Sequence, residues 1–300
     1  MPINHPETLI KYCIGTTAEK ILTTQSLRWS APHLFSDPFE LNHESGLNFD
    51  PHILLQASIK MAAAMIFAKD APQGQTPLMA AIRRWRDEER FASPEEAEEV
   101  LKELLSQVVD QRQIAIDKIM TDWRRFTRNL RICCFSAKPD NLTAWSQYGD
   151  NHRGVAMRFR CGEFTALPNP KPVNYKAIRP EITTLKEQIA VIINNTSFHA
   201  QAYFYEKFTT KSPIFNAAQE WRCFREREHE QGLKNHVPDN LWFDDVKFER
   251  REITAVYFGI YTDTAVKRKI YDLVKEKYNQ AKIFQTKAVT GKYQIEFERL

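Results

Sequence analysis

Three segments between positions 131 and 160 decide the fold: RICCFSA (131–137), DNLTAWSQY (140–148) and GVAMRFR (154–160). The first is a short apolar run of the kind that forms a buried strand. The second opens with Asp-Asn, residues that favour the N-cap of a helix. The third alternates apolar residues with polar or small ones, which predicts a half-buried strand. Together they predict a strand, a short helix and a second strand.

Outward from this stretch, strands and helices stay interspersed. Toward the N-terminus, a helix over 17–25 precedes a strand over Ser26–Ser30, which Pro32 ends. Toward the C-terminus, the pattern predicts short strands at 173–175 and 220–224, helix within 180–208, a strand at 253–261, a helix capped by Asp263 and a closing hairpin over 282–297. Because these elements do not follow a regular βαβ order, we expect an α+β fold with a mixed β-sheet.

Residues 50–130 have a different character and predict a helical insertion. Asp50-Pro51 and Thr76-Pro77 each offer an N-cap followed by proline at the first helical position. Ser93 begins a capping box, and apolar residues recur at helical spacing beyond it. We therefore predict three helices, the last one long. We expect a single domain, 1–300, that contains this insertion.

The composition is that of a globular protein. With 43% hydrophobic and 27% charged residues, the chain can bury a sizeable core and stay in solution. A net charge of +4 permits an anionic ligand or RNA without demanding one. The five cysteines form no Cys-x-x-Cys pair and no His-x-x-x-His spacing occurs. We therefore expect neither a disulfide framework nor a metal site.

Targeting and nucleotide-loop patterns are absent from the sequence. The N-terminus shows no signal-peptide pattern, and no uncharged apolar run of about 18 residues occurs. We therefore expect a protein of the reducing cytoplasm that makes no membrane contact. Glycine is scarce, and neither Gly-x-Gly-x-x-Gly nor a Walker pattern is found.

Three blocks carry the candidate site, because each joins a short strand pattern to polar or aromatic residues just beyond it. The first runs from Lys11-Tyr12 to SDPFE (36–40), the second from Cys134 to Gly154, and the third from Lys211 to Arg222. Functional side chains concentrate where loops leave a rigid scaffold. We expect the three blocks to converge on one cleft.

In order and content, these blocks resemble a bacterial family of unknown function, DUF2971. The residues that carry the resemblance are Tyr12, Ser30, Asp37, Pro38, Phe39, Cys134, Phe135, Ser136, Trp145, Tyr148, Gly154, Lys211, Glu220 and Arg222. The resemblance covers nearly the whole chain apart from the helical insertion. It departs at Ala218, where the family tends to have the first Glu of a Glu-x-Glu pair.

The same order of blocks resembles, more distantly, the ADP-ribosyltransferase superfamily. That resemblance implies an ADP-ribosyltransferase-like fold, NAD as the substrate and no metal. In the superfamily a first strand supplies an Arg or His, a role that Tyr12 or Arg28 would take here. A second supplies a Ser or Tyr, here Ser136 with Tyr148, and a third carries the catalytic Glu, here Glu220. The remaining candidates for substrate binding are Ser30, Asp37, Trp145, Lys211 and Arg222.

Glu220 suits the chemistry that this resemblance implies. Cleavage of the nicotinamide–ribose bond builds positive charge on the ribose, as in glycoside hydrolysis. A fixed carboxylate beside that carbon stabilises charge that exists only in the transition state. The structural alternative is an ion pair with Arg222 or Lys211 on a solvated strand face, since Glu220 and Arg222 lie two apart on a strand.

Structural roles also compete at the other candidates. Trp145 and Tyr148 share a helix face, either as a stacking wall for a ligand or as a core pair, with Tyr148 the better placed to reach a ligand. The Asp37-Pro38-Phe39 segment favours a turn that Asp37 caps and whose Phe39 fills the core. Ser30 and Ser136 suit ribose or amide hydrogen bonds, and equally strand-end caps. Tyr12 equally suits the core.

A cluster of arginines at the end of the long helical segment is a candidate for phosphate contact: Arg124, Arg125, Arg128 and Arg131. Its structural alternative is a solvated helix C-terminus, where cations favour the helix dipole.

Three functional hypotheses follow. The first is an NAD-dependent ADP-ribosyltransferase-like enzyme, a toxin or anti-phage effector, with Glu220 as its catalytic residue. Its partners would be NAD, a protein or nucleic-acid acceptor and a cognate inhibitor or regulatory partner. The second is an effector that binds or cleaves nucleic acid. The third is a module that senses a nucleotide without turning it over.

Overall fold

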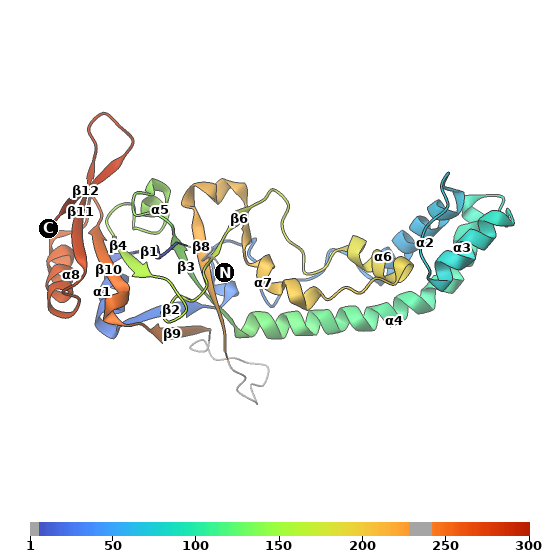
Figure 1. Cartoon of the computed structure of the whole chain (residues 1–300), viewed down its shortest axis with the longest axis horizontal. Coiled ribbons are helices and arrows are strands. Elements are labelled where there is room, and N and C mark those ends of the chain that lie inside the picture. Colours follow the sequence, from blue (N-terminus) through green and yellow to red (C-terminus); the bar gives the residue numbers. More distant parts are fainter. Residues whose placement is uncertain (1–5, 228–241) are drawn as a thin grey trace. The chain divides into compact units, whose positions relative to one another are not determined.

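The computed structural model describes residues 6–227 and 242–300 and falls into two compact units (Figure 1). The first unit comprises Met1–Leu41, Thr127–Arg179 and Phe208–Leu300, and the second comprises Asn42–Phe126 and Pro180–Lys207. Most of the predicted helical insertion therefore falls in the second unit, together with a later segment that the sequence did not associate with it.

The first unit is built on a mixed sheet with the strand order β12-β11-β10-β4-β1-β3-β2-β9. The strands are β1 (Thr8–Cys13), β2 (Ser26–Ser30), β3 (Leu130–Ser136), β4 (Val155–Arg160), β5 (Lys171–Pro172), β8 (Glu220–Glu226), β9 (Phe243–Lys247), β10 (Ile253–Phe258), β11 (Lys282–Ala288) and β12 (Ile295–Arg299). Strands β10 and β11 run parallel, whereas β1 and β4 are antiparallel. The predicted α+β class with a mixed sheet is confirmed.

The sheet splits at β3. On one edge, β3 pairs with β8 along its whole length, from Leu130 to Ser136. On the other edge, β1 meets β3 only at Ser136 and β2 meets it only at Ile132. Backbone groups of alternate residues point to the same strand edge. On the edge that faces β1 and β2, the backbone groups of Cys134, midway between Ile132 and Ser136, therefore meet neither strand. Two strands therefore diverge from one, with a stretch of open β3 edge between them.

Helices cover one face of this sheet. Helix α1 (Gly15–Thr24) packs beside α8 (Thr264–Lys277), and both contribute to a large apolar core (Figure 1). The core joins Ala18, Ile21, Leu22, Ile270 and Val274 of these helices to Leu9, Val155, Met157 and Phe159 of the sheet. Spacings of three and four residues place each helix's apolar side chains on the buried face.

The opposite face carries a second cluster, into which Trp145 of α5 (Leu142–Gln147) inserts with Tyr12, Ala156 and Tyr257. Strand β4 is consequently buried on both faces at its start. The sequence predicted a half-buried strand, which is wrong for Ala156 because its small side chain faces this second cluster.

Smaller elements complete the first unit. Strands β6 (Asn174–Tyr175) and β7 (Thr210–Lys211) form a separate parallel pair, and the 3-10 segments are η1 (Pro32–Leu34), η3 (Pro213–Ala218) and η5 (Arg250–Glu252). The sequence predicted neither β1 as a separate strand nor β9. Lys11 interrupts the apolar run of β1, and β9 carries two adjacent aspartates, so neither gives a strong strand pattern.

The second unit contains the three predicted helices, α2 (Pro51–Phe67), α3 (Pro77–Asp87) and α4 (Pro94–Asn129), with α6 (Leu185–Asn194), η2 (Ala200–Tyr203) and α7 (Phe204–Lys207). The predicted N-caps are present: Asp50 accepts from Ile53 N–H at 2.7 Å and Thr76 accepts from Met79 N–H at 3.1 Å. Arg112 interrupts the apolar stripe of α4 because it donates to Gln188 of α6 at 2.6 Å. No helix in the described parts of the chain is long and apolar enough to cross a membrane.

A candidate ligand pocket at the split of the sheet

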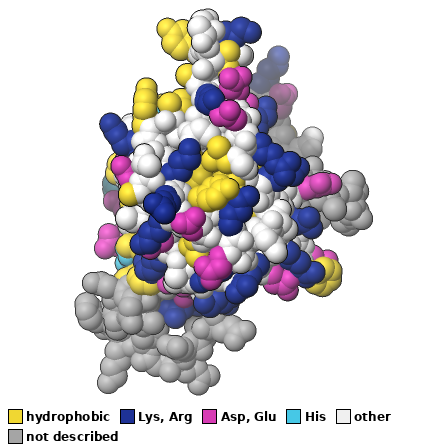
Figure 2. Space-filling model, turned by 90° about the vertical axis from the view of Figure 1, so that its left-hand side faces the viewer, with side chains coloured by type: hydrophobic (Ala, Val, Ile, Leu, Met, Phe, Trp, Pro, Cys, Tyr) yellow, Lys and Arg dark blue, Asp and Glu magenta, His cyan; other side chains and the backbone are white. Residues whose placement is uncertain are grey.

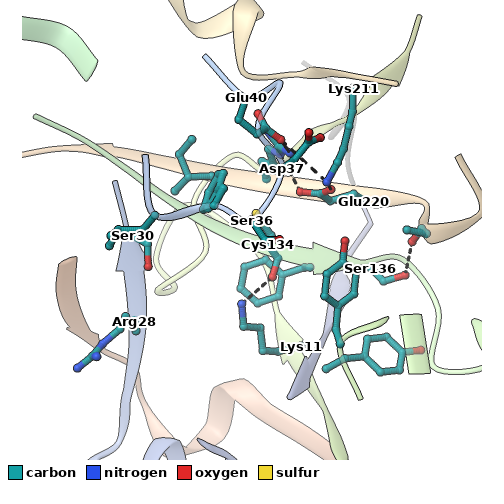
Figure 3. Close-up of a pocket in the computed structure, with 18 of the residues that line it drawn as sticks. Lys11, Arg28, Ser30, Ser36, Asp37, Glu40, Cys134, Ser136, Lys211 and Glu220 are labelled. Carbon is teal, nitrogen blue, oxygen red and sulfur yellow. Dashed lines mark hydrogen bonds and ion pairs between the residues drawn. The ribbon is translucent and has the colours of Figure 1, made fainter. Parts of the chain in front are cut away.

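A pocket of about 330 Å³ lies where β1 and β2 diverge from β3 (Figure 3). Its walls come from β1, β2, β3, β8 and the segment 34–40, so all three sequence blocks contribute. The candidate residues that line it are Tyr12, Arg28, Ser30, Asp37, Ser136, Tyr148, Lys211, Glu220 and Arg222. Trp145 is the one predicted pocket residue outside this lining. The convergence expected from the sequence is therefore present.

Strand register places the three blocks side by side. Ser136 of β3 lies opposite Ile10 of β1 on one side and opposite Glu220 of β8 on the other. Two residues earlier, Cys134 lies opposite Arg222. Because residues in register share a sheet face, Ser136 and Glu220 point to the same side. Elements more than 80 residues apart along the chain thus supply adjacent side chains.

Both oxygens of the Glu220 carboxylate are held by cations. Oε1 accepts from Nε of Arg222 at 2.8 Å, and Oε2 accepts from Nζ of Lys211 at 3.2 Å. Figure 3 shows Lys211 extending to Glu220 from the opposite wall. Only 6% of Glu220 is exposed. The predicted ion pairs are therefore real, but they are buried rather than on a solvated strand face.

The Arg222 guanidinium makes a second, bidentate pair with Glu40. Nη2 donates to Oε1 at 2.6 Å and Nη1 donates to Oε2 at 3.1 Å. Nη1 also donates to the Phe208 carbonyl oxygen at 2.9 Å. Two carboxylates and two cations thus form a closed network, with Glu40 and Glu220 balanced by Arg222 and Lys211. A buried arginine normally needs such partners.

This network sets the charge state of Glu220. Burial alone would raise the pKa of its carboxyl, but the charges of Arg222 and Lys211 outweigh burial and hold the pKa at about 2. Burial likewise opposes the charge of Lys211, yet Glu220 raises its pKa above the ordinary value. Burial, and then the nearby Glu220 charge, raise the pKa of the Cys134 thiol well above its usual range. Glu220 is therefore anionic and Cys134 a neutral thiol at physiological pH.

Hydroxyl groups occupy the pocket around this network. Ser136 Oγ donates to the Ala218 carbonyl oxygen at 3.0 Å, which leaves its lone pairs available to a ligand. Ser30 Oγ has no protein partner in the described chain. Tyr148 follows the last residue of α5 and is 41% exposed, so its ring stands at the mouth of the pocket.

Trp145 belongs to the core. It has no exposed surface, packs edge-on against Tyr12 with ring centroids 5.1 Å apart, and donates from Nε1 to the Pro139 carbonyl oxygen at 2.8 Å. Tyr12 borders the pocket, but its hydroxyl donates to the Lys138 carbonyl oxygen at 2.6 Å. Of the two roles considered for these aromatic residues, Trp145 therefore has the core role, whereas Tyr148 faces the pocket where a ligand would bind.

Arg28 lines the pocket but its charge is engaged elsewhere. It pairs with Asp245 of β9 through two hydrogen bonds of 3.0 Å, and it lies 3.7 Å from the ring centroid of Phe243. Figure 3 shows its side chain extending away from Glu220. Arg28 therefore borders the pocket without joining the Glu220 network.

The turn at Asp37 follows the prediction in part. Asp37 Oδ1 accepts from the Phe39 backbone N–H at 3.0 Å, which is the expected capping contact. Phe39 is 65% exposed, so the expectation that it fills the core is wrong. The buried side chain of this turn is Glu40, which reaches Arg222.

The arginines at the end of α4 separate into different environments. Arg124 and Arg125 belong to the second unit and are exposed, with Arg125 paired to Asp122 at 2.7 Å. Arg131 is only 1% exposed and donates to the Arg128 and Leu130 carbonyl oxygens. Its inclusion among phosphate contacts is wrong, because strand β3 places it inside the first unit.

Sequence reasoning missed three residues of the site: Lys11, Glu40 and Tyr175. The Tyr175 hydroxyl accepts from the Glu220 backbone N–H at 2.8 Å. Lys11 and Glu40 lie inside the sequence blocks. A charged residue among apolar neighbours was the sequence signal that could have identified them as buried and functional. Among residues 6–227 and 242–300, no three His, Cys, Asp or Glu side chains gather as a metal ion would require.

Comparison with known proteins gives one finding. Residues 144–223 match the model of a family described as "Protein of unknown function (DUF2971)". This segment holds Tyr148, Lys211, Glu220 and Arg222, so it supports the family resemblance over the end of the second block and over the third block. No significant match was found among curated proteins or among solved structures. The resemblance of the fold to ADP-ribosyltransferases therefore stays a prediction.

Proposed function

We propose that this protein is an ADP-ribosyltransferase-like enzyme that cleaves the nicotinamide–ribose bond of NAD. The observation that carries the proposal is a single one: an anionic carboxylate, Glu220, is fixed in a pocket of about 330 Å³ at the split of the sheet. That volume is within the usual range for small-molecule sites. The three blocks that resemble the superfamily meet in the same pocket.

The proposed reaction breaks the bond between C1′ of the ribose and the pyridinium nitrogen. Nicotinamide leaves with the bonding electrons as a neutral molecule, and C1′ acquires oxocarbenium character. A nucleophile of the acceptor, or water, then bonds to C1′ and gives up its proton. The Glu220 carboxylate stabilises the developing cation and, with a pKa of about 2, is ready to do so throughout the physiological pH range.

The ion pairs of Glu220 fit a positioning role. Arg222 is held in turn by Glu40, so the Oε1 contact fixes the carboxylate plane. Lys211 contacts Oε2 at the longer distance of 3.2 Å through a flexible side chain. In the proposed enzyme, Lys211 swings from Oε2 when substrate enters, which exposes one oxygen to the ribose.

Other pocket residues suit the recognition of nicotinamide riboside. Tyr148 offers an exposed ring face at the mouth for stacking. The Ser30 and Ser136 hydroxyls can hydrogen-bond the ribose or the carboxamide. The acceptor would approach beside Ala218, whose small side chain leaves room where the related family tends to carry a Glu.

A second candidate function is a nucleotide-sensing module without turnover. The observation that favours it is that cations hold both Glu220 oxygens, and a carboxylate that stays in this state has little charge to offer a substrate. Such a protein would bind NAD but release no nicotinamide.

Nucleic-acid binding has weaker support. Arg131 is buried and Arg125 is paired. Figure 2 shows the face of the first unit that carries α8, where Lys and Arg side chains alternate with Asp and Glu instead of forming one stripe. Interspersed charges of both signs are typical of an ordinary solvated surface.

The distinguishing experiment follows nicotinamide release by chromatography. The purified protein is incubated with NAD, alone and with cell lysate as a source of acceptor, and NAD binding is measured by thermal shift. Release under either condition supports the enzyme. A thermal shift without release supports the sensing module. No release and no thermal shift would contradict both proposals.

A further inference from the structure

The ammonium of Lys11 is a half-buried cation without a carboxylate partner. Its Nζ donates to the Cys134 carbonyl oxygen at 2.9 Å and lies 3.8 Å from Sγ of Cys133 (Figure 3). Its other close contact is with the Phe135 ring, whose centroid is 5.3 Å away. No Asp or Glu of residues 6–227 and 242–300 makes an ion pair with it. Within the described chain, the charge of Lys11 is therefore stabilised by a backbone carbonyl, a thiol sulfur and a ring face, and by no carboxylate.

The position of Lys11 follows from the split of the sheet. The β3 edge at Cys134 has no strand partner, so its carbonyl oxygen would be left unpaired without the ammonium. One of the three N–H bonds of the ammonium fills this place. A second N–H bond faces Sγ of Cys133 at 3.8 Å, which leaves one N–H bond for a ligand.

Lys11 stands out among the cations of the pocket lining. Arg222 and Lys211 are paired with Glu40 and Glu220, and Arg28 is paired with Asp245. The remaining carboxylate of the lining, Asp37, accepts from the Phe39 backbone N–H in its own turn. An unbalanced cation in a partly desolvated place is costly unless an anion joins it. Ionisable groups in such unusual surroundings cluster at functional sites.

A second pocket of about 360 Å³ adjoins this ammonium. It lies between α1 and β2, and it shares Lys11, Arg28 and Ser30 with the Glu220 pocket. Lys20 of α1 adds another cation to its lining, and Thr17 adds a hydroxyl. The hydroxyls of Thr17 and Ser30 have no protein partner in the described chain. Cations next to unpaired hydroxyl donors are the groups that recognise phosphate.

We propose that the α1–β2 pocket binds a phosphate group, with the Lys11 ammonium as its anchor and Lys20, Thr17 and Ser30 as further contacts. The identity of the molecule that carries this phosphate rests on the proposed function. The phosphate is either the diphosphate of the dinucleotide in the Glu220 pocket or a phosphate of the acceptor. In both cases the chemistry recognised is a phosphate ester or anhydride. Lys11 is then a binding residue that joins the two pockets.

The test measures the binding of inorganic pyrophosphate to the full chain by calorimetry at two salt concentrations. Nicotinamide riboside, which carries no phosphate group, serves as the control ligand. The native chain should bind pyrophosphate, more weakly at high salt. Lys11→Met should weaken that binding at least tenfold and leave riboside binding within about twofold. Lys292→Met, which changes an exposed lysine in the β11–β12 hairpin, should leave both unchanged.

A thermal melt without ligand separates binding from a structural role. Lys11→Met breaks no ion pair and leaves only the Cys134 carbonyl oxygen without its partner. It should therefore melt closer to the native chain than Lys211→Met, which removes a cation from the buried carboxylate of Glu220. Equal pyrophosphate binding by the native and Lys11→Met chains would overturn the proposal. So would absence of pyrophosphate binding by the native chain.

The same measurements identify the source of the phosphate and keep the two proposals apart. If NAD displaces pyrophosphate, the site holds the diphosphate of the dinucleotide; if both bind together, it holds a phosphate of the acceptor. Pyrophosphate binding does not depend on turnover. Binding that Lys11 controls, without nicotinamide release, would therefore support this site and contradict the proposed enzyme.

Discussion

Arg222 and Glu40 form a bidentate ion pair across 182 positions of sequence, with both groups almost completely buried. Strand β8 supplies Arg222, and the turn after η1 supplies Glu40. This pair fixes the guanidinium that in turn holds Glu220. The orientation of the proposed catalytic carboxylate therefore depends on a residue from the opposite end of the chain.

Loss of Arg222 should be severe for stability. Arg222→Ala leaves the buried carboxylates of Glu40 and Glu220 with Lys211 as their shared cation, so we expect a loss of about 3–5 kcal/mol in the free energy of unfolding. Arg28→Ala breaks a pair whose side chains are 44% and 41% exposed, and we expect about 1 kcal/mol or less. Urea unfolding of both variants measures the contrast. Similar losses in the two would show that the buried network is not what stabilises this part of the protein.

Stability should depend on pH through Glu220. Its pKa is about 2 in the folded protein against an ordinary value of 4.5, so its ionisation stabilises the fold fully above pH 4.5 and this contribution disappears as pH falls toward 2. The full contribution is about 3 kcal/mol. Glu220→Gln resembles the protonated state. The stability difference between native and variant chains should be about 2 kcal/mol smaller at pH 3 than at pH 6. A pH-independent difference in urea unfolding would refute this.

Elements set by contacts between residues close in sequence could be predicted, whereas elements set by contacts between distant residues could not. The caps at Asp50 and Thr76 act on backbone groups three residues away, and the helices they begin were predicted at the right positions. Strand β9 was not predicted, because its two aspartates break the apolar pattern; one of them, Asp245, pairs with Arg28 across the sheet. The strand propensity of a segment contains no information about a partner on a distant strand.

The site shows the same division. Glu220, Lys211 and Arg222 were predicted as candidates through the family resemblance of the third block, and the structure joins their side chains. Glu40 was quoted in its motif without a role, since nothing local reveals a buried pair with Arg222. Trp145 and Tyr148 were predicted to share one helix face, with Tyr148 the better placed to reach a ligand. The helix ends between them, and Tyr148 reaches the mouth of the pocket while Trp145 is buried.

These two aromatic residues should respond differently to truncation. Trp145→Ala removes a fully buried side chain and should cost about 3–5 kcal/mol in unfolding free energy. Tyr148→Ala should cost about 1 kcal/mol or less, because its ring is partly exposed, and should weaken NAD binding instead. Paired thermal melts and NAD titrations check both. Unchanged NAD affinity in Tyr148→Ala would remove the stacking role.

Gly154 offers a test of the backbone packing that holds β1 against β4. A Cβ there would lie 2.3 Å from the Cys13 carbonyl oxygen and 2.9 Å from that of Gly149, so backbone must move. We expect Gly154→Ala to lower the melting temperature clearly. Gly46→Ala, where a Cβ would meet nothing within 4 Å, should change stability by about 0.5 kcal/mol or less. Equal melting temperatures would show that the close approach relaxes easily.

The central claim is that Glu220 stabilises the cation formed when nicotinamide leaves NAD, and one measurement addresses it directly. Nicotinamide release is followed for the native chain, for Glu220→Gln and for Glu252→Gln, which changes an equally buried carboxyl outside the pocket. Circular dichroism confirms that each variant is folded. We predict release by the native chain and by Glu252→Gln, with a loss of about 100-fold or more in Glu220→Gln. Release by a folded Glu220→Gln at the native rate would contradict the account.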